Sequence, residues 1–231
     1  MGIGRPVAVV VVVVAVAGLA PAHAETLASL VRPLAGAEVD WSVGTVTASA
    51  GAAADMRMPS PDAARPGAER RARAAAIEKL RAALRALPLR GNERLSEKQV
   101  ATALGHANTA RSEYQSNGGV VLWVGVRFEQ LLGSASVTTT ATTTATATTT
   151  ATEPVALAVA AMPLELAPWM VAGGKEIVLG RVRYHHGPPP AGAISARRDD
   201  KGRLVLPRGS EAMIDRLAGG PVVIYLEKVL P

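Results

Sequence analysis

The spacing of apolar residues changes once along the first third of the chain. In residues 39–48 every second position is apolar or β-branched, which is the period of a β-strand. These alternating residues are Val39, Trp41, Val43 and Thr45. From Ala68 onward a stripe spaced by three and four residues predicts an amphipathic helix. The stripe consists of Ile77, Leu80, Leu84 and Leu87.

Proline and glycine mark where these elements are expected to end. Residues 50–67 contain three prolines and two glycines, so the sequence predicts an irregular loop there. Pro66 or Gly67 would then begin the helix, because proline is tolerated in a first helical turn. Pro88 and Gly91 would end it.

A second helix and a hairpin are predicted from local motifs. Ser96 and Gln99 have the spacing of a capping box, and Leu95 and Val100 occupy the positions of a hydrophobic staple. Farther along, Asn117-Gly118 predicts a tight turn, since both residues accept positive φ. The turn would join strands at residues 111–115 and 120–128.

The C-terminal part predicts more strands and one short helix. Ser210 is expected to cap a helix over residues 211–217, and the apolar run 222–226 is expected to lie inside a sheet. The other strands are expected at residues 155–160, 176–179, 192–197 and 203–206. The predicted fold class is α+β: an antiparallel sheet with two helices packed on one face, plus a smaller mixed α/β C-terminal part.

A tract of threonine and alanine alone, residues 138–152, divides the chain. It has no side chain large enough to contribute to a core, so it is expected to be a linker. The domains would then be residues 25–137 and 153–231. Strand-like segments flank the tract, so an enlarged loop within one continuous sheet is the alternative.

The N-terminus has the pattern of an export signal. Arg5 precedes the apolar run 7–20, and Ala22-His23-Ala24 is a small-x-small cleavage site before Glu25. We therefore expect residues 1–24 to be a signal peptide and the mature chain to be periplasmic, the alternative being an uncleaved anchor. The chain contains no cysteine, so neither a disulfide nor an acylated cysteine anchor is available to it.

The composition limits the kinds of partner that the chain is expected to bind. The formal charge is +6, without a concentrated basic block, and there are only three Trp, three Tyr and one Phe. Nucleic-acid binding usually needs clustered cations and stacking aromatics, so no nucleic-acid partner is expected.

Several segments resemble the lipoprotein-20-like family of bacterial envelope proteins, to which the N-terminal domain of flagellar assembly protein T is related. The matching pieces are residues 39–51 (VDWSVGTVTASAG), 72–84 (ARAAAIEKLRAAL) and 119–126, with a fainter match at 164–180. The resemblance implies a structural or assembly role at the periplasmic face of the outer membrane, with other envelope proteins as partners. Family lipoproteins carry a cysteine after the signal, and this chain lacks it.

Candidate chemistry is sparse. No Gly-x-Ser-x-Gly, His-Glu-x-x-His or phosphate-binding glycine loop is present. His185-His186 is interpreted as a solvated loop pair, so no catalytic residue, metal site or cofactor is predicted. The expected function is non-enzymatic. Trp41 and Trp123 are the possible binding residues, for a periplasmic module that stacks on peptidoglycan sugar; core packing is the competing interpretation. A hydrolase of unknown type is the third class.

The export hypothesis gives the first testable prediction. If residues 1–24 are removed, N-terminal sequencing of the protein from the envelope fraction should begin at Glu25. Recovery of intact Met1 in that fraction would instead identify the valine run as an anchor.

Overall fold

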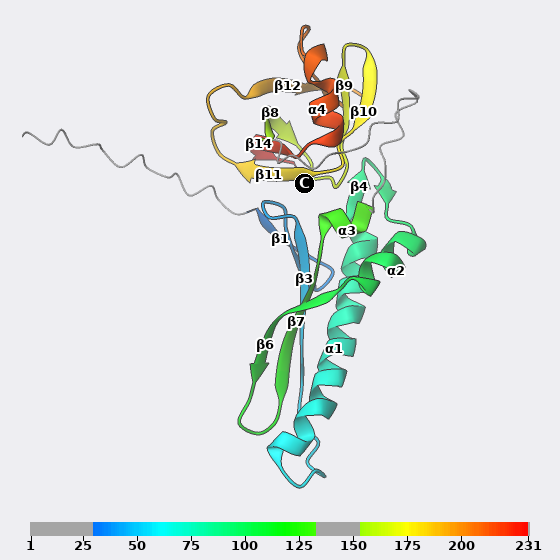
Figure 1. The fold of residues 1–231 in the computed structure, drawn as a ribbon, viewed down its shortest axis with the longest axis vertical. Coiled ribbons are helices and arrows are strands. Elements are labelled where there is room, and N and C mark those ends of the chain that lie inside the picture. Colours follow the sequence, from blue (N-terminus) through cyan, green and yellow to red (C-terminus); the bar gives the residue numbers. More distant parts are fainter. Residues whose placement is uncertain (1–29, 133–152, 231) are drawn as a thin grey trace, which may run out of the picture.

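The computed structural model describes residues 30–132 and 153–230, and it has an α+β fold, as predicted. The residues before the threonine/alanine tract and those after it form two halves, each with its own sheet (Figure 1). The N-terminal half contains β1 (Val31–Leu34), β2 (Ala37–Asp40), β3 (Thr45–Ala52), α1 (Pro61–Ala86), β4 (Pro88–Arg90), β5 (Glu93–Arg94), α2 (Glu97–Gly105), β6 (Asn108–Tyr114), β7 (Val120–Arg127) and α3 (Phe128–Leu132). The C-terminal half contains β8 (Val155–Met162), β9 (Trp169–Ala172), β10 (Lys175–Val178), β11 (Val182–His186), β12 (Ile194–Arg198), β13 (Leu204–Val205), a 3-10 turn (Glu211–Met213), α4 (Ile214–Gly219) and β14 (Val222–Val229).

The first sheet is antiparallel, with strand order β1-β2-β3-β7-β6, and α1 packs on β3 and β7. Small side chains let the helix approach the sheet closely, because a buried alanine recurs every fourth residue. This row runs Ala64, Ala68, Ala72, Ala76, Leu80 and Leu84, all buried. Leu80, Leu84 and Leu87 are fully buried as predicted, and Ile77 is partly buried.

The helix begins at Pro61, before the predicted start at Pro66 or Gly67, so the loop is shorter than the expected residues 50–67. The side chain of Ser60 accepts a hydrogen bond from the Ala63 amide at 3.3 Å, and Pro61 occupies the first turn. Pro66 lies inside the helix rather than at its start. Proline removes one helical hydrogen bond, but the buried Ala64 and Ala68 on either side keep this turn on the sheet.

The expected strand over residues 39–48 is two strands joined by a turn. β2 ends at Asp40, whose side chain accepts hydrogen bonds from the amides of Ser42 (2.9 Å) and Val43 (3.1 Å). Gly44 ends the turn with φ +75°. Aspartate at the first position and a positive-φ residue near the end are turn signals, and they override the alternation. Val43 is consequently 60% exposed.

The second helix and the hairpin are confirmed. Both hydrogen bonds of the Ser96–Gln99 capping box are present, and Leu95 and Val100 are buried. The hairpin turns at Asn117-Gly118, where Gly118 has φ +82°. β6 begins three residues earlier than expected, and Phe128 starts α3 instead of extending the strand, a helix that periodicity did not predict.

The second sheet is mixed and curled, with order β10-β9-β13-β12-β8-β14-β11 among the described residues. The final apolar strand, β14, lies between β8 and β11 and is parallel to both, so the expected interior position is confirmed. β9 and β11 were not predicted. The expected helix over 211–217 is instead a 3-10 turn followed by α4, because the Met213 amide bonds to the backbone carbonyl of Ser210 at 3.0 Å.

The two halves share a hydrophobic core. One continuous cluster includes Leu80 and Phe128 from the first half and Leu164, Tyr184 and Ile224 from the second. Backbone hydrogen bonds also cross the boundary, from the amides of Leu166 and Ala167 to the carbonyls of Pro88 and Leu89, at 3.0 and 2.9 Å. The threonine/alanine tract and the expected signal segment lie outside the described residues.

The packing of α1 gives a second testable prediction. Leu80→Ala removes a fully buried side chain from the helix–sheet interface, and should lower the free energy of unfolding by about 2–5 kcal/mol. Arg81→Ala is the neighbouring control, since its side chain is partly exposed and its ion pair is with Glu78 on the helix surface. It should change stability by less than about 0.5 kcal/mol in a denaturant melt; equal losses would mean that the buried face is assigned wrongly.

Candidate functional site

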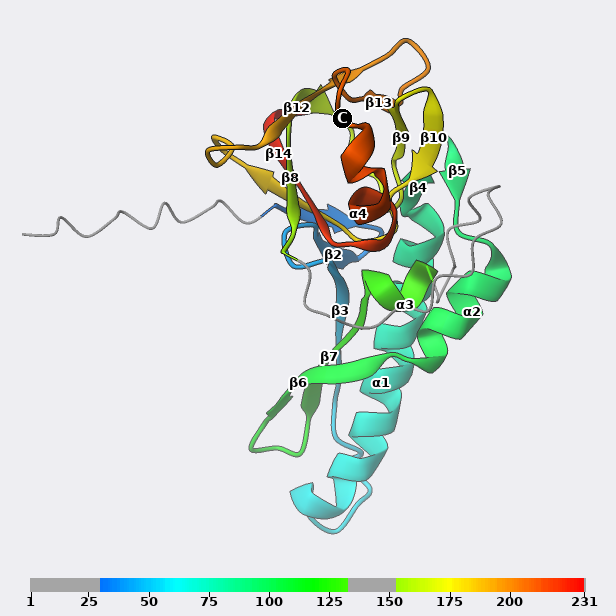
Figure 2. The ribbon, with the colours of Figure 1, turned by 45° about the horizontal axis from the view of Figure 1, so that its top comes forward.

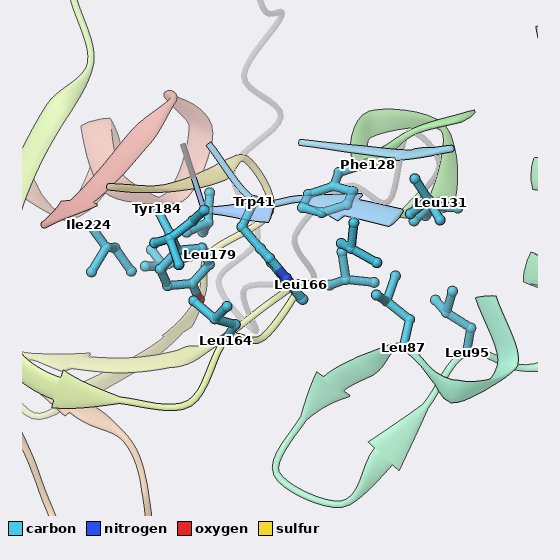
Figure 3. Packing of buried hydrophobic residues seen from close by; sticks show 14 of the residues in the cluster. Trp41, Leu87, Leu95, Phe128, Leu131, Leu164, Leu166, Leu179, Tyr184 and Ile224 are labelled. Carbon is cyan, nitrogen blue, oxygen red and sulfur yellow. The ribbon is translucent and has the colours of Figure 1, made fainter. Parts of the chain in front are cut away.

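Trp41, one of the two predicted binding residues, lies in the core between the halves. It occupies the β2–β3 turn and is 3% exposed. Its ring packs in T-shaped arrangements with the rings of Phe128, at a centroid distance of 5.2 Å, and Tyr184, at 5.8 Å. Figure 3 shows the indole between Phe128 on one side and Tyr184 and Leu164 on the other. Both ring partners lie outside α1, Phe128 in α3 and Tyr184 in β11.

The backbone at Trp41 also bridges the halves. The Tyr184 amide of β11 donates to the Trp41 carbonyl at 3.0 Å, and the Trp41 amide donates to the Leu30 carbonyl at 3.0 Å. The turn that closes β2 onto β3 is therefore hydrogen-bonded to the edge strand of the second sheet. A tryptophan held in this way has no open face with which to stack on a sugar.

Two features favour glycine at position 44. Its φ of +75° is strained for other residues, and a Cβ added there would lie 2.2 Å from Nη1 of Arg183. The Arg183 guanidinium lies against the glycine and donates a charged hydrogen bond to Glu129 on α3. This ion pair is a second link between β11 and the N-terminal half.

Glu165 is the buried carboxylate of the junction, with 5% of its surface exposed. Its Oε1 accepts a hydrogen bond from the Gly91 amide of the β4–β5 hairpin at 2.9 Å. Burial raises the pKa of the Glu165 carboxyl above its ordinary value of 4.5, and the Gly91 amide and the positive charge of Arg198 oppose this rise. The carboxylate therefore joins two segments rather than facing a substrate-sized space.

Tyr184 completes the junction. Its hydroxyl donates to the Glu165 carbonyl at 2.8 Å and accepts from the Glu165 amide at 3.3 Å. Burial holds the pKa of the Tyr184 hydroxyl above its usual range, so it stays neutral. Both polar functions of the side chain are thus used in fixing the 164–167 segment.

Trp123 lies elsewhere, on the sheet surface opposite α1. We call this surface the outer face; it carries Thr45, Thr47, Ser49, Val121, Trp123 and Gly125 from β3 and β7. Trp123 is half-buried and lies opposite Ser49 on β3, and the guanidinium of Arg111 on β6 is 4.8 Å from its ring centroid. The structure does not bring Trp41 and Trp123 together: one is in the core and the other is on the outer face.

The histidine pair lies on a strand, not in the solvated loop that was expected. His185 and His186 end β11, where successive side chains point to opposite faces. His185 is half-buried beside Tyr225, with ring centroids 5.6 Å apart. Desolvation lowers the pKa of His185, and the negative charge of Asp40 opposes this. Among the described residues no group of three or more His, Cys, Asp or Glu is placed to hold a metal ion.

Two shallow cavities of about 390 and 370 Å³ lie on the described surface of the C-terminal half. The first is lined mainly by the β9–β10 turn and the segment after β13, with Arg208 as its only ionisable residue. The second contains Arg216, Glu153 and Tyr225 among small and apolar residues. Neither lining contains a nucleophile beside a histidine or a pair of carboxylates, the arrangements on which hydrolytic catalysis depends.

The chain was compared with protein-family models and with curated proteins. No protein-family model matches the chain, and no curated protein matches it significantly. Among the helices of the described residues, none is both long enough and apolar enough to cross a bilayer. The likeness to the lipoprotein-20-like family therefore stays a prediction based on the segments quoted above.

Sequence reasoning missed Phe128 and Tyr184 as the ring partners of Trp41, and Glu165 as the buried carboxylate beside Tyr184. Phe128 falls at the end of an expected strand and Tyr184 between two expected strands, and nothing in their spacing indicates a contact with Trp41. A signal for Glu165 does exist, since it is the only charge in the apolar segment Met162–Pro168. An isolated carboxylate in such a segment usually has a buried hydrogen-bond donor as its partner.

The buried carboxyl gives a third testable prediction, made with Glu165→Gln. Because the folded-state pKa is raised, the folded protein binds a proton that the unfolded chain releases. Wild-type stability should therefore fall relative to Glu165→Gln as the pH rises from the ordinary value of 4.5 through the raised pKa. The measurement is the difference in unfolding free energy between the two proteins across this pH range.

Glu227→Gln, at an exposed position of β14, is the control for the loss of one carboxylate. Other titrating carboxylates cancel in the difference between variant and wild type. A difference that does not change with pH would show that Glu165 is not desolvated in solution.

Proposed function

We propose that this protein is an exported, non-enzymatic protein of the bacterial envelope that acts in the assembly of a larger structure. The observation that carries the proposal is a projecting arm with one uncovered face. α1, β3, β6 and β7 extend together away from the C-terminal half (Figures 1 and 2). The 26 residues of α1 span about 39 Å.

The arm has two unlike faces. One face of β3 and β7 is covered by α1, and no described element packs against the outer face. Thr47, Ser49 and Trp123 of that face are only partly buried, and every residue of β6 is exposed. A sheet with one open polar face and a free edge is suited to binding another protein.

The chemistry of the described residues supports a role without catalysis. Ionisable side chains at the junction between the halves have partners within the fold. Arg183 forms an ion pair with Glu129, and Glu165 accepts a hydrogen bond from the Gly91 amide. Neither cavity holds a catalytic arrangement. The N-terminal pattern of Arg5, the valine run and Ala22-His23-Ala24 supports export to the periplasm.

The finer proposal, a role in flagellar or outer-membrane assembly, is supported by the resemblance at residues 39–51 and 72–84. Within the turn of the first segment, the structure gives Trp41 and Gly44 packing roles. The partners would be other envelope proteins, without a lipid anchor on this chain.

Photo-crosslinking in cells tests the assembly role. A crosslinking residue at Thr47, on the outer face, should give discrete adducts with envelope proteins, and the adducts should disappear when residues 1–24 are deleted. The control position is Ala75, exposed on α1. Equal yields of adducts at the two positions, or none at Thr47, would contradict the use of the outer face.

The second candidate is a peptidoglycan-binding module, and the observation in its favour is Trp123. An accessible indole beside the Arg111 guanidinium is a surface on which a sugar ring can stack. Trp41 does not take part, because it is buried. The candidate thus depends on one aromatic residue, whereas a sugar platform gains from several.

Two tryptophan substitutions separate these candidates and give the fourth prediction. Trp41→Ala should lower the free energy of unfolding by about 3–5 kcal/mol, and Trp123→Ala should cost much less because its ring is half-exposed. We expect the wild-type protein not to sediment with purified sacculi. If it does sediment, and a stable Trp123→Ala protein does not, the binding module replaces the assembly role.

A further inference from the structure

Among the described residues, no strand pairs with the outer edge of β6, at the side of the arm. β6 is the last strand in the order β1-β2-β3-β7-β6, and all of Asn108–Tyr114 is exposed. α1 packs on β3 and β7 and reaches one face of β6 through two arginines: the Arg65 guanidinium lies 5.8 Å from the Tyr114 ring centroid, and Arg73 donates to Oγ1 of Thr109 at 2.8 Å. These contacts are made with side chains on a face of the strand, and the helix lies to the side of the outer edge (Figure 2). A free edge presents backbone groups that can pair with another strand.

The hairpin geometry shows which backbone groups point outward. The Gln115 amide donates to the Gly119 carbonyl at 2.8 Å, and the Gln115 carbonyl accepts from the Gly118 amide at 3.0 Å. Gln115 therefore faces β7, and in an antiparallel ladder the direction alternates at each residue. Arg111 and Glu113 also bond toward β7, opposite Trp123 and Val121. The amide and carbonyl groups of Ser112 and Tyr114 point away from the sheet.

The charges next to Ser112 are arranged symmetrically. Arg111 and Glu113 flank it and project to the same side of the strand, the side of Trp123. If a second copy pairs antiparallel with Ser112 opposite Ser112, each Arg111 lies opposite the Glu113 of the other copy. Opposite charges facing each other across two strands stabilise the pairing, and a two-fold axis creates this contact twice.

The same charges select this register. Registers centred on Ala110 or Tyr114 would also use outward-pointing groups. With Tyr114 at the centre, however, Arg111 and Glu113 lie opposite Asn117 and Gln115, so no charge is matched. The irregularity between Thr109 and Arg111 further limits regular pairing near Ala110. Only the register centred on Ser112 matches both charges.

We propose that two copies of this chain pair antiparallel along β6, centred on Ser112, and join their five-stranded sheets into one continuous sheet. The ion pair between Arg111 and Glu113 within each chain is exposed, with 66% and 48% of the side chains accessible. Such a pair adds little stability, so exchanging it for two pairs between chains is not opposed. The pairing does not depend on the proposed envelope function.

The interface is short, and this sets its expected strength. Stable protein–protein interfaces bury about 1,200–2,000 Å² in total, more than one short strand edge provides. The dimer should therefore be weak and in rapid exchange, and it should form at high local concentration.

Analytical ultracentrifugation of charge variants tests the proposal. Each protein is expressed as the full chain and measured in the form that the cell produces. The weight-average mass of the wild type should rise with concentration from one chain toward two. Arg111→Glu and Glu113→Arg each place like charges opposite each other, so each alone should remain monomeric. An equimolar mixture of the two should form a heterodimer, because all facing charges are then opposite.

Lys175→Glu, at the exposed edge of β10, is the matched control for charge reversal and should associate like the wild type. Thermal melts of each variant establish that the fold is intact. A wild type that stays monomeric at every concentration overturns the proposal. So do single variants that dimerise as well as the wild type, or a mixture that does not associate.

Discussion

The structure depends on the burial of Trp41, a turn residue of one sheet, in the core that both halves share. Its ring fills the space between Phe128 and Tyr184, and its carbonyl accepts the Tyr184 amide. The neighbours are constrained by this position: Gly44 has no side chain, so Arg183 can lie against it and reach Glu129. Because polar and apolar contacts meet here, the two halves form one packed body around a short turn.

Elements governed by local physics could be predicted from the sequence. The Ser96–Gln99 capping box, the Asn117-Gly118 turn and the interior strand β14 each depend on side chains a few residues apart or on a continuous apolar run. The helix starts earlier than Pro66 predicts, because Ser60 caps it and Pro61 occupies its first turn. β9 and β11 are short strands whose positions are fixed by pairing with distant strands, and such pairing leaves little trace in local spacing.

The candidate site shows the limit of reasoning from alternation. A period of two places Trp41 and Trp123 on strand faces, but it does not say which face another element covers. The difference in burial between the two tryptophans arises from the second half of the chain. It covers Trp41 with Tyr184 and leaves Trp123 half-exposed next to Arg111. The amide that donates to the Glu165 carboxylate likewise comes from a hairpin 74 residues away in sequence. Contacts at that separation are not encoded in any short window.

The position of β14 has a consequence for when the fold can close. β14 (Val222–Val229) lies between β8 and β11 and pairs with both. Until β14 is in place, nothing connects β11 to β8 in the sheet. A chain that emerges N-terminus first, from a ribosome or a translocation channel, cannot complete the second sheet before Val229 is free. Since β11 covers Trp41 and pairs with β14 alone among the described strands, the N-terminal half keeps an exposed apolar end until β14 is available. Closure of the two halves on each other is therefore timed by β14.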